Sequence, residues 1–206
     1  MSIVADFRYQ YVPGSSGRTL LLLHGTGGNE QDLLGLGHQL DPTASLLSPR
    51  GRVLENGMPR FFRRLAEGVF DIEDLKFRTH ELANFVVAAS SELDFDAGDV
   101  TAVGFSNGAN FAASLLLLRP EILRAAILLR PMVPLVPEAL PDLGGVRVGI
   151  AAGTMDPIAS VAETRRLEAL LVESGAEAEV RFAEAGHNLT QADLVNAKSW
   201  MEAFRS

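Results

Sequence analysis

Cysteine is absent from this chain of 206 residues. It therefore cannot form a disulfide framework, and it has neither a thiolate nucleophile nor a thiolate metal site. The chain also lacks an uncharged apolar stretch of transmembrane length, and no basic segment followed by an apolar one opens it. These absences predict a soluble cytoplasmic protein without a signal peptide and without stable membrane insertion.

Basic charge is in the minority, with 18 Lys and Arg against 26 Asp and Glu, a net charge of −8 and a pI near 5.0. This balance argues against nucleic acid or an anionic membrane as the main partner. One basic cluster, mixed with aromatic residues, runs from Arg50 to Arg64. We interpret it as a solvated loop or helix face, with contact to an acidic group of a substrate or partner subunit as the alternative.

Internal repeats, low-complexity tracts and a linker to a second domain are missing as well, so residues 1–206 are expected to form one domain. Strands are expected at 7–12, 20–24, 44–47, 100–103, 125–129, 146–151 and 178–182, and helices at 30–40, 74–93, 109–118, 158–174 and 190–204. This alternation predicts an α/β fold, with a mostly parallel central sheet, helices on both faces and no large lid. Residues 49–76 look less regular, and the prolines of 131–141 exclude regular structure there.

The pattern G-x-S-x-G occurs at Gly104 to Gly108, with Ser106 at its centre. An apolar run typical of a strand precedes it and a helix-forming run follows directly, which is the context of a nucleophile elbow. The two glycines let strand and helix pass close to the serine, whose hydroxyl is then exposed at the positive end of a helix. The alternative is a β-turn serine that caps the helix.

A serine hydroxyl needs a base to take its proton, and the base needs a carboxylate to orient it. Asp156 and His187 both come after the elbow, each behind a strand-like segment, and this order is that of the α/β-hydrolases. Asp156 has a second interpretation as a helix N-cap, whereas Asp142 and Asp94 follow no buried strand. We expect Ser106 as nucleophile, His187 as base and Asp156 as orienting acid.

A tetrahedral intermediate needs at least two hydrogen-bond donors around its oxyanion. The backbone N–H of Asn107 comes directly after the serine and is the first donor expected from an elbow. The second is expected from the glycine-rich loop His24 to Gly28, where the N–H of Thr26 is the candidate and His24 shapes the loop. A phosphate cradle is the weaker interpretation, because the full G-x-G-x-x-G/A pattern and the lysine of a P-loop are missing.

Four pieces of the chain together resemble the phospholipase/carboxylesterase branch of the α/β-hydrolase superfamily, which includes acyl-protein thioesterases and small bacterial carboxylesterases. The pieces are LLLHGTGGN at 21–29, GFSNG at 104–108, GTMD at 153–156 and Gly186-His187. The resemblance implies the triad named above, with Thr26 and Asn107 as oxyanion donors. Asn107 stands where eukaryotic thioesterases usually carry glutamine, and the proline-rich 131–141 segment replaces their shorter loop. Both differences favour the bacterial carboxylesterases.

The expected reaction is hydrolysis of a small-molecule carboxylic ester with a short or medium acyl chain, through an acyl-serine intermediate that needs no metal or organic cofactor. The aromatic segment 58–77 and the 131–141 segment are expected to wall the pocket, with ordinary core or a dimer contact as the alternative. The residues expected to contact the substrate are Gly25, Met58, Phe61 and Met132.

Other functions stay open. A lysophospholipase or acyl-protein thioesterase would use the same triad with a longer groove. A dienelactone-hydrolase-like enzyme is disfavoured, because such enzymes usually carry a cysteine nucleophile and this chain has none. A non-catalytic ligand-binding module is the alternative of another class, since a fold does not fix a function. The physiological substrate and the oligomeric state, a homodimer included, do not follow from the sequence.

Overall fold

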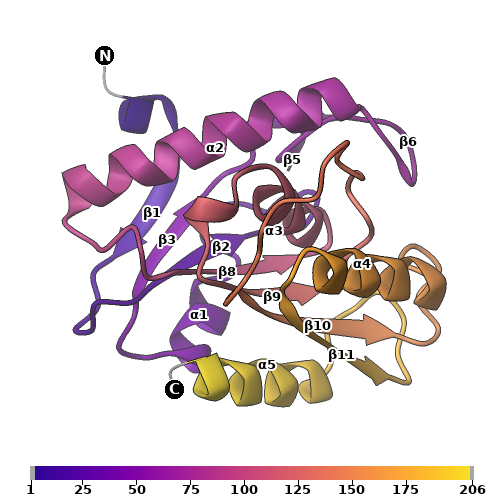
Figure 1. Cartoon of the computed structure of the whole chain (residues 1–206). Coiled ribbons are helices and arrows are strands. Elements are labelled where there is room, and N and C mark those ends of the chain that lie inside the picture. The colour runs from indigo at the N-terminus through magenta and orange to yellow at the C-terminus, as the bar shows by residue number, and fades with distance from the viewer. Residues whose placement is uncertain (1–2, 205–206) are drawn as a thin grey trace.

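A sheet of seven strands runs through the middle of the computed structural model, which describes residues 3–204 (Figure 1). In spatial order the strands are β1 (Tyr9–Val12), β3 (Ser45–Pro49), β2 (Thr19–Leu23), β8 (Val100–Phe105), β9 (Ala125–Leu129), β10 (Arg147–Gly153) and β11 (Glu177–Ala183). β1 pairs with β3 in the antiparallel sense, and every other neighbouring pair is parallel. The predicted mostly parallel sheet is confirmed.

Helices cover both faces of this sheet. Those of the described part are α1 (Leu34–Leu40), α2 (Ile72–Leu93), α3 (Asn107–Leu118), α4 (Val161–Glu173) and α5 (Gln191–Phe204), with 3₁₀ turns at η1 (Ile3–Asp6) and η2 (Pro120–Ile122). Figure 1 shows α2, α3 and α4 on one face and α1 and α5 on the other. Apolar side chains fill the space on each face and form two separate clusters. The predicted α/β architecture is confirmed.

The central strands are mostly apolar and are buried along nearly their whole length. All residues of β2 and β9 are buried, and so are the first five of β8. A parallel strand covered by helices on both faces has no solvent-facing side, which explains these continuous apolar runs. Because parallel strands end at the same edge, the loops after β2, β8, β9, β10 and β11 all lie at that edge.

The first α-helix is shorter than expected from the sequence. The sequence predicts a helix over 30–40, but α1 begins at Leu34. Before it the backbone forms tight turns, with hydrogen bonds from Asp32 N–H to the Asn29 carbonyl (3.3 Å) and from Leu34 N–H to the Gln31 carbonyl (3.2 Å). The side chain of Asn29 also accepts from Gln31 N–H (2.8 Å), and such local bonds compete with a helix.

The segment 49–76, which the sequence suggests is less regular than the rest, contains two small hairpins. β4 (Val53–Glu55) pairs with β5 (Met58–Arg60), and β6 (Arg64–Ala66) pairs with β7 (Val69–Phe70). The first hairpin turns at Asn56-Gly57, whose φ angles are 50° and 81°. Asn-Gly is the pair that such a turn prefers, so the sequence carried a hairpin signal within the segment that was expected to be less regular. Residues 131–141 contain neither helix nor strand, as their prolines predicted.

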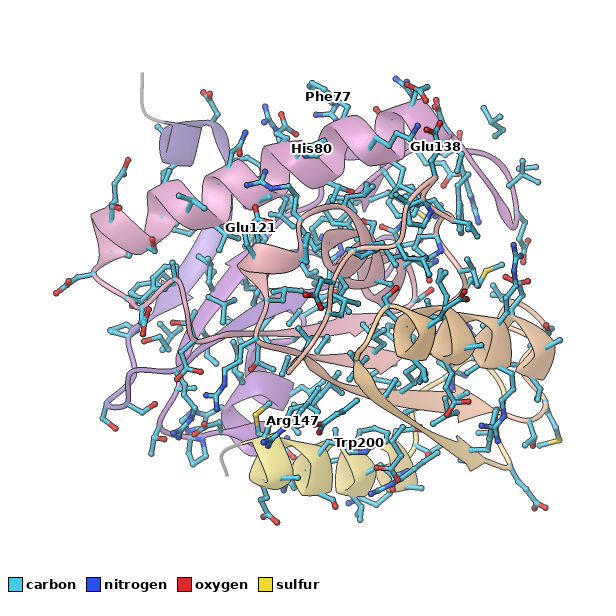
Figure 2. The ribbon with its side chains drawn as sticks, in the orientation of Figure 1. Phe77, His80, Glu121, Glu138, Arg147 and Trp200 are labelled. Carbon is cyan, nitrogen blue, oxygen red and sulfur yellow. The ribbon has the colours of Figure 1, made fainter. Side chains whose placement is uncertain are left out.

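The longest helix, α2, crosses the outside of the sheet. Asp71 caps its start by accepting a hydrogen bond from Asp74 N–H (3.1 Å). Its inner side is apolar, whereas Phe77 and His80 are exposed; Figure 2 shows Phe77 projecting away from the sheet. His80 is therefore a surface residue. Within residues 3–204, no helix has the length and apolar character that crossing a bilayer requires.

Candidate functional site

The turn between β8 and α3 holds Ser106 in a strained conformation. Its φ of 52° and ψ of −114° are unusual for a residue with a side chain. The backbone fixes it from both sides: Ser106 N–H donates to the Leu129 carbonyl (2.9 Å), and the Ser106 carbonyl accepts from Asn110 N–H (3.0 Å). This places the serine at the end of β8 and at the start of a helix.

Glycine is required on both sides of the serine. A Cβ at Gly104 would lie 2.5 Å from the Gly108 carbonyl oxygen, and a Cβ at Gly108 would lie 2.0 Å from the Leu23 carbonyl oxygen. No real Cβ tolerates such a contact with backbone. The two glycines thus let α3 pass against β8 and β2, which is the close approach that the G-x-S-x-G pattern predicted.

Three side chains from three loops meet in one series of hydrogen bonds. His187 Nε2 lies 2.8 Å from Ser106 Oγ, and His187 Nδ1 lies 2.8 Å from Asp156 Oδ2. Ser106 follows β8, Asp156 follows β10 and His187 follows β11. The imidazole therefore bridges a hydroxyl and a carboxylate that are 50 positions apart in the sequence.

Asp156 contacts both the imidazole of His187 and the backbone of the turn that follows it. Its Oδ2 faces His187, while its Oδ1 accepts hydrogen bonds from the N–H groups of Ile158 (2.8 Å) and Ala159 (3.0 Å). The side chain is fully buried, with an exposed fraction of 0%. Because two backbone donors fix the carboxylate, its second oxygen is held in position for the imidazole. The N-cap of α4 is Ser160 rather than Asp156.

The backbone N–H groups of Thr26 and Asn107 are the two donors that the sequence suggested for an oxyanion. In the described part of the chain, neither the N–H of Thr26 nor that of Asn107 donates a hydrogen bond. Both residues line the same cavity as Ser106. Asn107 opens α3, so its N–H also lies at the positive end of a helix.

The loop that carries Thr26 is held by buried polar side chains. His24 Nε2 accepts from Gly51 N–H (3.0 Å), so its proton lies on Nδ1, which donates to the Gly25 carbonyl (2.7 Å). Burial lowers the pKa of His24, and hydrogen bonding to Gly25 offsets this only in part. Arg60 Nη1 donates to Thr26 Oγ1 (2.6 Å). His24 thus shapes the glycine loop, as the sequence suggested.

A cavity of about 350 Å³ opens in front of Ser106 and His187. Its other walls are polar at Thr26, Arg60, Arg64, Glu67, Asn107, Asn110 and Asn188, and apolar at Gly68, Phe70, Phe105, Met132 and Ile158. The two hairpins and the 131–141 segment both contribute to the wall. Met132 is held there because its N–H donates to Asn110 Oδ1 (2.7 Å).

The residues expected to contact the substrate occupy different places. Met132 lines the cavity, and Gly25, Met58 and Phe61 do not appear in its wall. Phe61 is buried, and its ring stacks against Phe111 with centroids 5.0 Å apart. A Cβ at Gly25 would lie 2.9 Å from the Phe105 ring, so Gly25 lies directly behind a wall residue. Met58 is half-exposed, and its sulfur faces Gly27.

Arg130 is a site residue that the sequence analysis missed. It follows β9, its φ is 58°, and its side chain has an exposed fraction of 0%. Its guanidinium donates to the carbonyls of Gly186 (3.0 Å) and Asn188 (3.1 Å), which flank His187 on either side. One buried arginine therefore holds the loop that carries the imidazole, through hydrogen bonds on both sides of His187.

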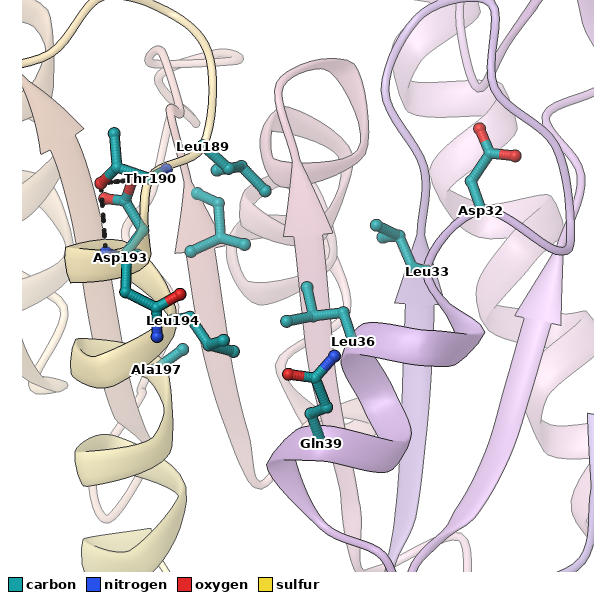
Figure 3. Close-up of a pocket in the computed structure, with 11 residues that line it drawn as sticks. Asp32, Leu33, Leu36, Gln39, Leu189, Thr190, Asp193, Leu194 and Ala197 are labelled. Carbon is teal, nitrogen blue, oxygen red and sulfur yellow. Dashed lines mark hydrogen bonds between the residues drawn. The ribbon is translucent and has the colours of Figure 1, made fainter.

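A second cavity, of about 430 Å³, lies between α1 and α5 on the other face of the sheet (Figure 3). Leucine and alanine side chains dominate its wall, and Figure 3 shows Thr190 and Asp193 hydrogen-bonded at one end. None of the three linked side chains lines it. Among residues 3–204 no cluster of His, Asp and Glu could hold a metal ion.

Comparison with known proteins finds relatives over almost the whole chain. MhqD of Bacillus subtilis strain 168, a protein named as a hydrolase, is 52% identical over 193 residues, which cover 94% of this chain and 96% of MhqD. No protein-family model matches the chain.

Solved structures are also similar to this chain over nearly its whole length. A carboxylesterase of Bacillus cereus has a TM-score of 0.95 at 50% identity, with 97% of this chain and 95% of its own covered. The protein YahD, solved with malic acid, has a TM-score of 0.91 at 31% identity, with 96% of this chain and 99% of its own covered. The likeness is thus not confined to one segment.

Proposed function

Because the chain belongs to the carboxylesterase family of the α/β-hydrolase superfamily, we propose that it hydrolyses carboxylic esters through an acyl-Ser106 intermediate. The observation that carries this mechanism is the hydrogen-bonded series from Ser106 Oγ through the His187 ring to Asp156 Oδ2. A neutral imidazole with its proton on Nδ1, facing the carboxylate, leaves Nε2 free to accept the serine proton.

The reaction has two halves. In the first, Ser106 Oγ attacks the ester carbonyl while His187 takes its proton; the bond to the alcohol oxygen then breaks, and His187 gives the proton to the leaving alcohol. In the second, His187 deprotonates a water that attacks the acyl-serine, and the acid leaves as Ser106 regains its proton. Asp156 orients the imidazole and stabilises its charged form in both halves.

The free N–H groups of Thr26 and Asn107 are the proposed oxyanion hole. Asn107 directly follows the serine, Thr26 lines the same cavity, and no internal acceptor competes for their N–H groups in the described part of the chain. Donors that are fixed before the reaction stabilise a developing oxyanion strongly, and removing one typically costs about 10²–10³ in kcat. The cavity of about 350 Å³ suits a short or medium acyl chain.

The test is labelling by a fluorophosphonate probe, which reacts with an activated serine. Wild type should be labelled and should hydrolyse p-nitrophenyl butyrate, whereas Ser106→Ala should do neither. Ser91→Ala, at an exposed serine of α2, is the matched control and should behave as wild type. If wild type is neither labelled nor active, the chain is a non-catalytic ligand-binding module and the proposal is wrong.

A substrate panel then separates the esterase from its closest alternatives. p-Nitrophenyl esters of two to twelve acyl carbons should be compared with a lysophospholipid and an acyl thioester. We expect the highest kcat/KM among the shorter esters, because the cavity is small. A higher kcat/KM for the lysophospholipid or the thioester would replace the carboxylesterase assignment with that activity.

A further inference from the structure

Two arginines line the cavity that contains Ser106. Arg60 ends β5 and is buried, with an exposed fraction of 3%, and Arg64 begins β6 and is partly buried. An arginine is rarely buried unless its charge is used, because removing a guanidinium from water is costly. These two residues belong to the basic cluster for which contact with an acidic group was one interpretation of the sequence.

The guanidinium of Arg60 is fixed but only partly used. Nη1 donates to Thr26 Oγ1 (2.6 Å) and Nε to the Phe62 carbonyl (3.3 Å). Within residues 3–204, Nη2 of Arg60 donates no hydrogen bond, nor does either terminal nitrogen of Arg64. Several donors therefore remain available to a molecule in the cavity.

The arginines are only partly neutralised by the protein. Glu55 lies between them, with one oxygen 2.9 Å from Arg64 Nε and the other 3.4 Å from Arg60 Nε. One carboxylate thus faces two guanidinium groups. Glu67 also lines the cavity, but it is exposed to solvent, which screens its charge. Burial and the nearby Arg64 charge lower the pKa of Arg60, and Glu55 opposes this shift. An added anion would relieve that repulsion.

We propose that Arg60 and Arg64 bind a carboxylate of the substrate, so that the preferred substrates are esters that carry a second, free carboxylate close to the ester carbonyl. The inference rests on the proposed esterase function and names its substrate class. Guanidinium groups match a carboxylate in charge and geometry, and a charge-assisted hydrogen bond is stronger than a neutral one. Because the cavity is small, the free carboxylate and the scissile ester must lie within a few bonds of each other.

Four esters test the proposal and show on which side the carboxylate lies. Monoethyl succinate carries it on the acyl side, and O-butyrylglycolic acid carries it on the alcohol side. Ethyl levulinate and acetonyl butyrate are their neutral counterparts, with a methyl ketone in place of the carboxylate. Wild type should hydrolyse at least one anionic ester with a kcat/KM about tenfold or more above that of its neutral counterpart.

Matched variants assign the preference to the cavity. Arg64→Met should reduce the anionic-to-neutral ratio about tenfold, and Arg64→Lys should keep part of it because the charge remains. Arg63→Met is the control: its guanidinium pairs with Asp71 (3.1 Å) and does not line the cavity, so the ratio should stay at the wild-type value. Added salt should lower the ratio of wild type.

The outcomes separate the two claims. If wild type cleaves the neutral esters as fast as the anionic ones, or faster, the carboxylate site is wrong and the esterase function stands. An equal loss of ratio in Arg63→Met would also overturn it, since the effect would then come from surface charge. Absence of hydrolysis of all four, together with absence of fluorophosphonate labelling, would overturn the esterase function itself. Inhibition of p-nitrophenyl butyrate hydrolysis by succinate should exceed inhibition by butyrate.

Discussion

Arg130 and Asp193 form an ion pair that is closed off from solvent. Two parallel hydrogen bonds join them, Nη2 to Oδ2 at 2.7 Å and Nη1 to Oδ1 at 2.8 Å, and the side chains have exposed fractions of 0% and 3%. Asp193 also accepts from Thr190 N–H (2.7 Å), at the entry to α5. The pair thus joins the end of β9, the His187 loop and the last helix.

Replacing Arg130 should therefore destabilise the fold strongly. Arg130→Met leaves the Asp193 carboxylate buried without its partner, and we expect a loss of about 3–5 kcal/mol in the free energy of unfolding. Arg130→Met combined with Asp193→Leu should lose less, because no uncompensated charge remains. Urea denaturation of both variants measures the difference. Equal or greater destabilisation of the double variant would contradict the prediction.

Asp156→Asn should abolish most activity while the fold survives. Its remaining oxygen can still accept from the N–H groups of Ile158 and Ala159, but an amide N–H facing His187 Nδ1 favours the wrong imidazole tautomer. By analogy with the best-studied serine proteases, kcat on p-nitrophenyl butyrate should fall on the order of 10⁴-fold. A circular dichroism spectrum and urea midpoint close to those of wild type are required as the control. A loss of less than tenfold would show that the carboxylate does not orient the base.

Asn107→Ala should weaken the fold more than an ordinary surface change. Asn107 Oδ1 accepts from the buried N–H of Phe61 (2.8 Å), which joins the end of the first hairpin to the elbow. Leaving that N–H without a partner should cost about 1–3 kcal/mol of unfolding free energy. Asn84→Ala, at an exposed asparagine of α2, is the control, and its change should stay within about 0.5 kcal/mol. Equal urea midpoints for the two variants would exclude this role.

Lowering the pH should remove the contribution of Glu30 to the stability of the fold. Burial alone would raise the pKa of Glu30, but hydrogen bonds from Arg50, its own N–H and Arg8 outweigh it and hold the pKa at about 2, below the ordinary 4.5. A carboxyl whose pKa is lower in the folded state stabilises the fold above pH 4.5, and that contribution disappears as the pH falls through about 2.

The measurement is the urea midpoint of wild type and Glu30→Gln at pH 7, 4.5 and 3. The difference in urea midpoint between the two proteins should be largest at pH 7 and should become smaller as the pH falls. Glu184→Gln, at an exposed carboxylate, should differ little from wild type in urea midpoint at every pH. A difference between wild type and Glu30→Gln that stays constant with pH would show that the ion pairs of Glu30 do not control how stability changes in acid.

The α/β-hydrolase fold expected from the sequence is confirmed, and the reason is topological. Ser106, Asp156 and His187 each follow an apolar run, and strands that are parallel must end at one edge. Alternation of strands and helices is enough to bring such residues together, whatever the detailed shape of the loops. Their catalytic roles are proposals, but their meeting is a consequence of strand order.

The cavity wall did not follow from the sequence in the same way. Arg60 and Arg64 come to the site through two separate hairpins, and only the first of them, which carries Arg60, turns at Asn56-Gly57. Arg130 carried no usable signal. An arginine after a buried strand usually reaches solvent, and its partner Asp193 lies 63 positions later.

The two hairpins have a consequence for how substrate range can change. Each pairs only with itself and neither joins the central sheet. Ser106 and His187, the proposed nucleophile and base, therefore follow strands of the central sheet, whereas Arg60, Arg64 and Phe70 belong to the two hairpins. Insertions or exchanges in the tips of these hairpins can remodel the chemistry of recognition without moving the reacting atoms, which makes them the natural place for laboratory evolution of new selectivity.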